Sequence, residues 1–383
     1  MKRRWRRFSP AGLRRLGGPV LAVFAAAGAI VLMMPVLQLL AQRALVASTV
    51  LVLPDAGFAG LKERFAAEEI LLPSPEPETP AYSPSSGPES SEPLQENSSP
   101  PTNEPSASAK APEIPAAYQG RLLQETILGD ESNTFLSVGE GYLRNYTKLS
   151  FEEIAQIIES TPVFPLEADG DPEVLIVHTH ATESYEMYDS PVYDTRNSWR
   201  SLDNNNNMVR VGSAMARVLE ENGIGVIHDT TQHDYPSYNG SYDNSKATIQ
   251  KWLAEYPSIK IVLDVHRDAI QRDESTVVKP TAVIDGKKAA QLMIIAGSDD
   301  GTMNMPNWRT NLAFAVKLQN QVEADWPALT RPIFFCYRKY NMDLTPGSLL
   351  LEMGSNGNTL EEAVYSGELI ARSLADLITE MRG

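Results

Sequence analysis

The chain has 383 residues and a formal net charge of −16 at pH 7, from 49 acidic and 33 basic side chains. This charge repels a polyanion, so we expect no nucleic acid partner. The single cysteine, Cys336, excludes an intrachain disulfide, and because it lies in the apolar run PIFFCY we predict a buried thiol.

The N-terminal residues have the composition of a membrane anchor. Residues 1–15 contain seven lysines and arginines and no acidic residue, and residues 17–40 contain no charged residue. About 20 apolar residues suffice to cross the hydrocarbon core, and a basic flank stays in the cytoplasm. We predict a cytoplasmic basic tail at 1–16, a single transmembrane signal anchor at 17–41 and a membrane-proximal extracytoplasmic segment at 42–70. A cleaved signal peptide is the alternative, although its apolar stretch is usually shorter.

The next segment is rich in proline, serine and glutamate. Twelve of the 27 prolines of the chain fall between residues 71 and 120. Such a composition buries too little apolar surface to offset the entropy lost on ordering, and its prolines keep it extended. We predict a disordered linker at 71–118 and then one globular domain at 119–383, a length that is ample for a single hydrophobic core.

In the globular part, apolar runs alternate with segments of helical periodicity. Continuous apolar runs are typical of strands covered on both faces. The predicted strands are 173–178, 224–228, 259–266, 281–284, 292–296, 333–337 and 349–353. The predicted helices are 150–160, 204–222, 244–256, 309–326 and 360–381. This alternation predicts an α/β fold, a three-layer sandwich with a mostly parallel central sheet, in which 121–165 is a leader with one helix.

Two of the five histidines follow the first predicted strand at alternate positions, in VLIVHTHATES. They are His178 and His180, Glu183 lies three residues further on, and His266 ends another predicted strand. The carboxyl ends of parallel strands meet at one edge of a sheet, where ligands bind. Two imidazoles and a carboxylate are a zinc-type ligand set, and a catalytic zinc site uses three protein ligands. We therefore predict Zn2+ bound by His180, Glu183 and His266, with His178 as the alternative to His180 because residues i and i+2 of a strand share a face.

The segment DVHRDA around His266 offers supporting groups. Asp264 or Asp268 is expected to accept a hydrogen bond from the second ring nitrogen of His266, which orients a metal-binding imidazole. Arg267 adds a fixed positive charge that a carbonyl or carboxylate can contact. The two histidines of the polar run IHDTTQHDYPS are expected to be exposed to solvent.

Glu352 lies in the otherwise apolar strand SLLLEM. A buried carboxylate is costly, and desolvation raises its pKa toward the range that suits a general base. We predict Glu352 as the catalytic residue, which takes a proton from a water that attacks an amide carbonyl and then gives it to the leaving nitrogen. An ion pair with Arg338 or Lys339 is the alternative. The following SNGNTLEE predicts a helix cap at Asn358 or Thr359.

Together these motifs resemble a known family. VLIVHTHATESY, GIGVIHDTTQHDYPSYNGSYDNSKATI, YPSIKIVLDVHRDA and YNMDLTPGSLLLEMGSNGNTLEEA look like signatures of stage II sporulation protein P of endospore-forming bacteria, and they span about residues 173–365. The predicted anchor and linker also fit. That family is similar to the zinc-dependent N-acetylmuramoyl-L-alanine amidases, which have an α/β sandwich, a His-Glu-His zinc site and a catalytic glutamate before a turn that EMGSNGN resembles.

The resemblance implies functions for the chain and for its residues. It supports Glu183 and His266 as zinc ligands and Glu352 as the catalyst, while Arg267 and Asn341 are candidate substrate-binding residues within the motifs. It implies a peptidoglycan hydrolase of sporulation that acts at the septum and the engulfing membrane, with amidase and cross-link endopeptidase activity. It also implies two companion engulfment proteins as partners, a membrane protein and a lytic transglycosylase.

A catalytically inactive amidase-fold module that binds or regulates the cell wall is the alternative. Such a module is expected to have lost a ligand or Glu352, and the sequence retains all of them. The enzyme is therefore the favoured interpretation.

Overall fold

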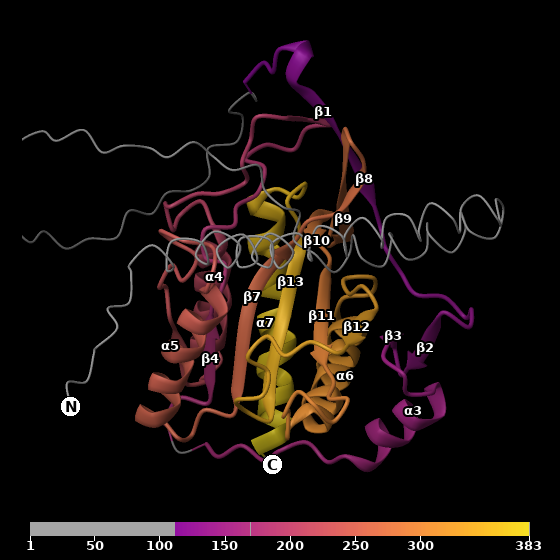
Figure 1. Cartoon of the computed structure of the whole chain (residues 1–383), viewed down its shortest axis with the longest axis vertical. Helices are drawn as coiled ribbons and strands as arrows, with labels where there is room; N and C mark the ends of the chain where they lie inside the picture. The colour runs from indigo at the N-terminus through magenta and orange to yellow at the C-terminus, as the bar shows by residue number, and fades with distance from the viewer. Residues whose placement is uncertain (1–111, 169, 383) are drawn as a thin grey trace, which may run out of the picture. The chain divides into compact units, whose positions relative to one another are not determined.

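The structure is a computed structural model that describes residues 112–168 and 170–382 (Figure 1). The predicted basic tail, signal anchor and membrane-proximal segment, with most of the predicted linker, lie outside the described residues. Among the residues that are described, no helix is both long and apolar enough to cross a membrane.

An eight-stranded sheet forms the centre of the domain, in the order β2-β3-β12-β11-β13-β7-β4-β6. Its strands are β2 (Phe135–Val138), β3 (Gly141–Tyr146), β4 (Val174–Val177), β6 (Val226–His228), β7 (Ile261–Asp268), β11 (Leu292–Gly297), β12 (Ile333–Cys336) and β13 (Gly347–Ser355). Two neighbouring pairs, β2 with β3 and β11 with β13, are antiparallel, and the other five are parallel. The sheet is therefore mixed, with the parallel majority that the sequence predicts.

A second, smaller sheet was not predicted. It has the order β10-β9-β1-β5, and β8 pairs with β9. Its strands are β1 (Gln119–Glu125), β5 (Val192–Asp194), β8 (Gln271–Asp273), β9 (Thr276–Ile284) and β10 (Lys287–Ala290). The prediction that 121–165 is a leader with one helix was wrong, because β1, β2 and β3 all lie there. β1 and β3 have partners that are distant in the chain, as in Leu123 with Val278, so local patterning does not reveal them, and β2 pairs with β3.

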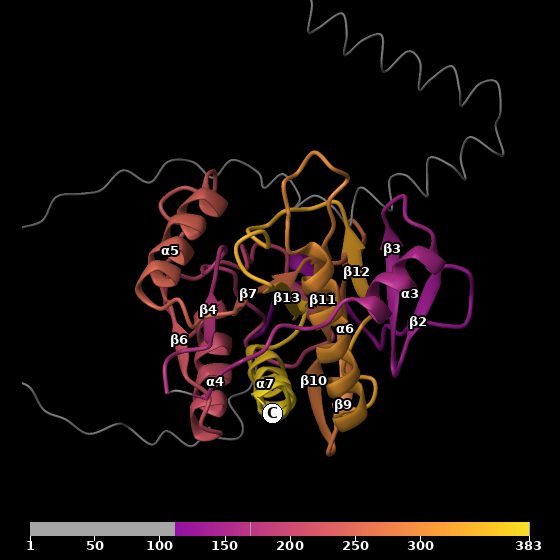
Figure 2. The same cartoon turned by 90° about the horizontal axis from the view of Figure 1, so that it is seen from below.

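All five predicted helices are present, with boundaries shifted by a few residues. They are α3 (Phe151–Ser160), α4 (Met208–Glu221), α5 (Ser241–Glu255), α6 (Trp308–Asp325) and α7 (Leu360–Arg382), and a short 3-10 helix, η1 (Ala116–Tyr118), precedes β1. Helix α7 packs against both α4 and α6 on one face of the large sheet. Helix α5 covers the other face over β4 and β7, so the domain has three layers (Figure 2).

The start of α7 has the predicted cap. The Thr359 hydroxyl accepts a hydrogen bond from the amide of Glu362 at 3.2 Å, and the Glu362 carboxylate accepts one from the amide of Thr359 at 3.1 Å. This reciprocal arrangement satisfies donors that a helix start leaves unpaired. Cys336 is buried in β12 as predicted, and burial raises the pKa of its thiol to about 12.

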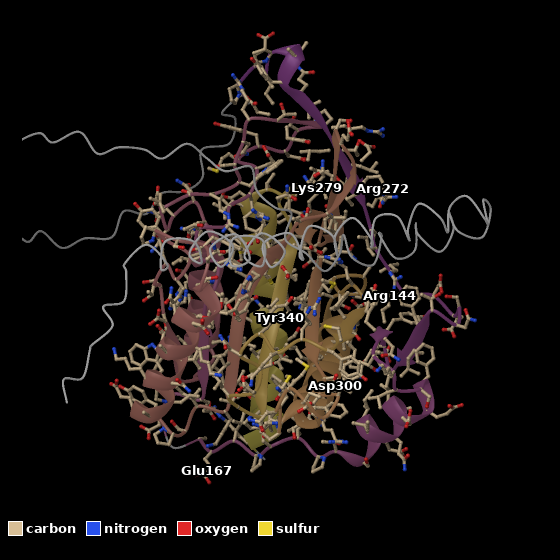
Figure 3. The ribbon with its side chains drawn as sticks, in the orientation of Figure 1. Arg144, Glu167, Arg272, Lys279, Asp300 and Tyr340 are labelled. Carbon is tan, nitrogen blue, oxygen red and sulfur yellow. The ribbon has the colours of Figure 1, made fainter. Side chains whose placement is uncertain are left out.

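A buried ion pair joins the start of α7 to the small sheet. Lys279 of β9, labelled in Figure 3, is 2% exposed, and its Nζ lies 2.7 Å from Glu362 and 2.7 Å from Asp189. Lys288 of β10 reaches the same Asp189 at 2.6 Å, but its side chain is 39% exposed. The two lysines therefore share a partner and differ in burial.

This difference predicts unequal effects of removing each lysine. Lys279→Ala leaves the buried Glu362 without its counter-ion, which costs about 3–5 kcal/mol of unfolding free energy. Lys288→Ala, the matched control, removes an exposed pair that contributes roughly 0–1 kcal/mol. Urea denaturation followed by tryptophan fluorescence measures both values. Equal losses from the two variants would contradict the role of burial.

Candidate active site

The central strands bring two of the predicted site residues side by side. β7 and β13 pair in parallel, and the register sets Glu352 opposite His266. Directly paired residues of neighbouring strands project from the same face of a sheet. β4 pairs with the other side of β7 and ends at Val177, opposite Asp264, so the segment after β4 reaches the same edge.

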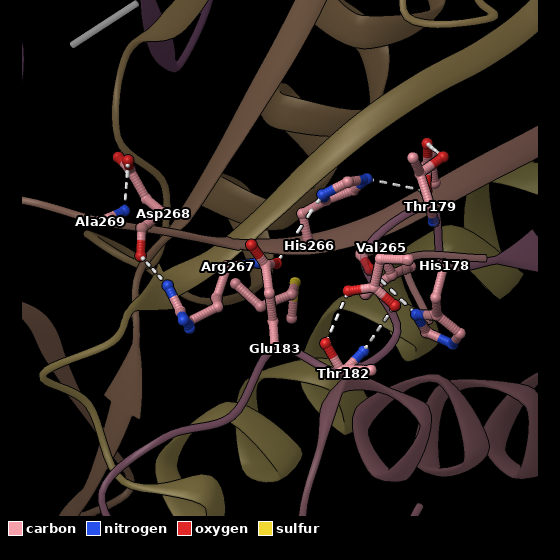
Figure 4. Close-up of polar contacts among 12 residues, drawn as sticks. His178, Thr179, Thr182, Glu183, Val265, His266, Arg267, Asp268 and Ala269 are labelled. Atoms are coloured by element: carbon pink, nitrogen blue, oxygen red, sulfur yellow. Dashed lines mark hydrogen bonds and ion pairs between the residues drawn. The ribbon is translucent and has the colours of Figure 1, made fainter. Parts of the chain in front are cut away.

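His178 is a structural residue of the core. It is fully buried, its Nδ1 lies 2.9 Å from the carbonyl oxygen of Val265, and its Nε2 lies 2.9 Å from Nε2 of His228 (Figure 4). A Cβ on Gly212 of α4 would collide with its ring, so the helix packs directly on it. Burial, together with the neighbouring His228, lowers the pKa of His178 to about 3. Both ring nitrogens therefore have partners within the core.

His180 differs from His178 in having a ring nitrogen without a partner. The side chain is buried, and its Nδ1 is sealed from solvent with no hydrogen-bond partner among the described residues. Its ring stacks on Tyr238, with centroids 4.5 Å apart, and stands perpendicular to His266 at 5.2 Å. Burial lowers the pKa of His180 to about 4, so the imidazole is neutral near pH 7. A neutral imidazole with a free nitrogen is the form that binds a metal.

Glu183 lies between His266 and two arginines. One carboxylate oxygen is 3.8 Å from Nδ1 of His266 and accepts a hydrogen bond of 3.3 Å from the amide of Arg267. The other is 3.9 Å from Arg200. Burial raises the pKa of Glu183, but the positive charges of Arg267 and Arg200 outweigh this effect, and the pKa lies below its ordinary value. The group is therefore an anion in the folded chain.

Asp264, rather than Asp268, is the carboxylate beside His266. Its Oδ1 lies 2.8 Å from Nε2 of His266, at an angle that is poor for a hydrogen bond, and it also accepts the Thr179 amide at 2.8 Å. Burial lowers the pKa of His266, but the charge of Asp264 outweighs it and raises the pKa to about 9. Asp268 pairs instead with Arg331 at 2.9 Å. The contact with Asp264 leaves Nδ1 of His266 facing Glu183.

Glu352 is a partly buried carboxylate without a counter-ion contact. Its Oε2 is sealed from solvent and has no hydrogen-bond partner among residues 112–168 and 170–382. Burial, followed by the negative charge of Asp268, raises the pKa of Glu352 to about 8. The alternative ion pair with Arg338 or Lys339 is not formed, and Lys339 lies 3.0 Å from Asp343 instead. A group with these properties can hold a proton near neutral pH and release it.

The donor set fits a zinc ion in its chemistry, provided that His266 gives up the proton that its raised pKa holds near pH 7, and the spacing of its atoms is close to that of a zinc site. Two tetrahedral zinc ligands at about 2.1 Å from the ion lie roughly 3.4 Å apart. Nδ1 of His266 and the nearer oxygen of Glu183 are 3.8 Å apart. The sealed Nδ1 of His180 supplies a third donor that lacks a partner. In the part of the chain that the structure describes, no three of these groups already lie at the spacing of a metal site.

The two candidate substrate-binding residues are engaged in the fold. The Arg267 guanidinium donates hydrogen bonds to the carbonyl oxygens of Ser184 at 2.8 Å and Trp199 at 3.0 Å. The Asn341 amide donates to the Tyr242 carbonyl at 2.9 Å. Arg267 thus holds loop segments and Asn341 holds the first turn of α5, so these contacts lend no support to substrate binding by either.

The expectation that the histidines of IHDTTQHDYPS are exposed was wrong for His233. It is 3% exposed, with Nδ1 2.9 Å from the His178 carbonyl oxygen and Nε2 2.9 Å from the Thr248 hydroxyl. His228 is half-buried against His178. A polar run predicts a surface loop, but here His233 joins the segment after β4 to α5, and His228 packs against His178.

A tyrosine beside the histidines was not predicted. Tyr242, at the start of α5, stacks on His266 with centroids 6.4 Å apart and meets His180 edge to face at 5.5 Å. Burial, followed by the charge of Asp264, raises the pKa of Tyr242 well above its ordinary value. Its only signal in the sequence is its place in YPSYNGSYDN, where several tyrosines are equivalent by pattern.

The raised pKa of Glu352 predicts a pH-dependent stability of the metal-free protein. Its pKa is about 8 in the folded chain, whereas an unfolded glutamate has a pKa of about 4.3. The contribution of protonated Glu352 to the unfolding free energy is therefore fully present below about pH 4 and is lost as the pH rises through about 8. The side chain of the Glu352→Gln variant cannot titrate. As the pH rises from about 5 to about 8, the unfolding free energy of the wild type should therefore fall relative to that of the variant. Urea denaturation with a chelator measures this, and a constant difference would contradict the raised pKa.

Comparison with known proteins identifies the family. The model of the family Stage II sporulation protein P (SpoIIP) matches residues 81–375. The Stage II sporulation protein P of Bacillus subtilis (strain 168) is 29% identical over 229 residues, which cover 57% of this chain and 53% of that protein. The match thus spans about half the length of this relative.

Solved structures give weaker likenesses. The N-acetylmuramoyl-L-alanine amidase AmiC2 of Nostoc punctiforme is 10% identical with a TM-score of 0.33, covering 54% of this chain and 96% of that one. The CwlD amidase from Clostridioides difficile, in complex with the GerS lipoprotein, is 11% identical with a TM-score of 0.35, covering 55% and 98%. Likeness at this level carries no functional conclusion. The family model, in contrast, matches most of the chain, and the protein belongs to the SpoIIP family.

Proposed function

We propose that this SpoIIP-family protein is a zinc-dependent peptidoglycan hydrolase that cleaves the N-acetylmuramoyl-L-alanine amide bond. The observation that carries the proposal is the position of Glu352 directly opposite His266, with one carboxylate oxygen that is sealed from solvent and has no partner in the described chain. An uncompensated buried carboxylate is costly. Its presence beside two further potential ligands, Glu183 and His180, favours a chemical role over a structural one.

Three side chains of this site would hold the zinc ion: His180, Glu183 and His266. When it is bound, zinc lowers the pKa of a water and polarises a carbonyl group. The contacts of His178 with Val265 and His228 favour His180 as the first ligand, because His178 has no nitrogen to offer without breaking the core. Asp264 orients His266 from the opposite ring nitrogen.

Glu352 moves the proton in this mechanism. As a carboxylate, it takes a proton from the attacking water while the water oxygen forms a bond to the amide carbon. As a carboxylic acid, it then gives that proton to the nitrogen as the carbon–nitrogen bond breaks. A pKa near neutrality suits both steps, because Glu352 must accept the proton and release it again within one turnover.

The remaining parts of the proposal rest on sequence. The predicted anchor at 17–41 would hold the enzyme in the cell membrane with its domain outside, facing peptidoglycan at the sporulation septum and engulfing membrane. The family resemblance adds cleavage of the stem-peptide cross-link as a second activity. It also adds a membrane protein and a lytic transglycosylase as companion partners.

Digestion of purified sacculi tests the activity and its metal dependence. The zinc-loaded protein should release stem peptides with a free L-alanine amino group, detected by mass spectrometry, and excess chelator should stop the release. Cleavage that persists in chelator would contradict zinc dependence, and products cut only within glycan strands would contradict an amidase.

His266→Ala should lose both bound zinc and turnover, because it removes one of three ligands. His228→Gln is the matched control, since the ring of His228 contacts the buried His178 rather than a proposed ligand, and this variant should keep the zinc content near one ion per chain. Elemental analysis of the purified variants gives the metal content. Retention of stoichiometric zinc by His266→Ala would remove His266 from the ligand set.

Glu352→Gln should keep the fold and the zinc and lose most of the turnover. The amide has the shape of the carboxylate but cannot accept or deliver the proton, so the rate should fall by roughly 10²–10⁴-fold. Metal content, circular dichroism and the rate of peptide release are measured on the same preparation. Loss of zinc would make Glu352 a ligand, and near-normal turnover would remove it from the mechanism.

A further inference from the structure

Tyr242 has its ring fixed by three other rings of the site. It is the second residue of α5, and its ring stacks on His266 at 6.4 Å with an interplanar angle of 11°. Its ring also stacks on Tyr340 at 5.1 Å and meets the edge of His180 at 5.5 Å. Aromatic pairs in these arrangements hold one another in place. The phenol is therefore positioned against both predicted histidine ligands.

The hydroxyl of Tyr242 has no hydrogen-bond partner in the described chain. Buried tyrosine hydroxyls usually find one, and the neighbouring Tyr185 does, because its hydroxyl donates to the carbonyl oxygen of Met353 at 2.8 Å. The Tyr242 side chain is half-buried, and its hydroxyl is not among the unpartnered atoms that are sealed from solvent. This donor is thus both unused and open to a molecule that enters the site.

The phenol also lies within the electrostatic field of the catalytic carboxylates. Burial, and then the negative charges of Asp264, Glu352 and Glu183, raise the pKa of the Tyr242 phenol. A phenol is a donor at neutral pH, since its ordinary pKa is about 10. Among the groups around Glu352, the carboxylates accept hydrogen bonds and Arg267 donates to backbone carbonyls. Arg331 pairs with Asp268, and its remaining unpartnered Nε is sealed from solvent. Tyr242 is therefore an uncharged donor beside the site that has no acceptor among the described residues.

We propose that the Tyr242 hydroxyl donates a hydrogen bond to the oxygen of the scissile carbonyl as that oxygen becomes negative. The inference rests on the proposed amide hydrolysis and adds a catalytic residue to it. When the water oxygen bonds to the carbonyl carbon, the carbon–oxygen π pair moves to the carbonyl oxygen, and Glu352 takes the water proton. The Tyr242 O–H bond stays intact. The electron pair on the oxygen then forms the carbon–oxygen double bond again, the carbon–nitrogen bond breaks, and Glu352 protonates the nitrogen.

A donor that acts on the developing charge affects the transition state more than the bound substrate. In the zinc-loaded full-length protein, Tyr242→Phe should therefore lower kcat by about 10²–10³-fold and leave KM nearly unchanged. The ring stays in place, so the zinc content and circular dichroism should match those of the wild type. Tyr340→Phe, which keeps the outer ring of the stack, is the matched control and should retain the wild-type kcat.

Binding of inhibitors separates this role from a structural one. A phosphinate analogue of the amide, whose oxygens mimic the developing charge, should bind Tyr242→Phe more weakly by about the factor lost in kcat. A non-hydrolysable ground-state analogue should bind both proteins equally. Calorimetry measures the two affinities.

Two outcomes would overturn the inference: a kcat within about threefold of the wild type, or equal losses of affinity for both analogues. The proposed function fails separately, because wild-type protein that cleaves no amide bond would contradict it whatever the variant does.

Discussion

The site depends on the parallel pairing of β7 with β13. This register sets Glu352 beside His266 in the middle of a sheet that helices cover on both faces, so one oxygen of its carboxylate is sealed from solvent. The same desolvation that destabilises the anion gives it a pKa at which it can exchange a proton. A slip of one residue in this pairing would move Glu352 to the opposite face and would separate the two groups.

The surrounding polar side chains form a supporting frame in which nearly every group has a partner. Thr179 donates to Asp264, Arg267 donates to two loop carbonyls, and His178 lies between Val265 and His228. Three of the sealed atoms without a hydrogen-bond partner in the described part of the chain belong to this site: Nδ1 of His180, Nε2 of His266 and Oε2 of Glu352. Buried polar groups are normally satisfied. Such atoms are available to a ligand.

The small sheet holds the end of β13 in place. The hydroxyl of Ser355, the last residue of β13, donates to the Val278 carbonyl of β9 at 2.5 Å, and Lys279 pairs with Glu362 in the first turn of α7. The strand that carries Glu352 is therefore fastened to both the small sheet and the helix that follows it. Tyr185 adds a third tie, from its hydroxyl to the Met353 carbonyl. Such rigid support allows proton transfer at a defined position.

The sequence alone determined the alternating α/β architecture, the five helices, a helix cap at Asn358 or Thr359 and the apolar strand around Glu352, because each depends on local periodicity or spacing. Tertiary structure decided what depends on distant contacts. It separated His178 from His180: Val177 faces the α5 layer, so His178 faces α4 and is enclosed, whereas His180 lies beyond the strand. It also added the strands at 119–146, of which β1 and β3 have partners far along the chain, and engaged Arg267 with loop carbonyls. The pattern of residues within a segment does not show which distant residues will contact that segment. For this reason the position of Tyr242 beside the histidines is apparent only in the folded chain.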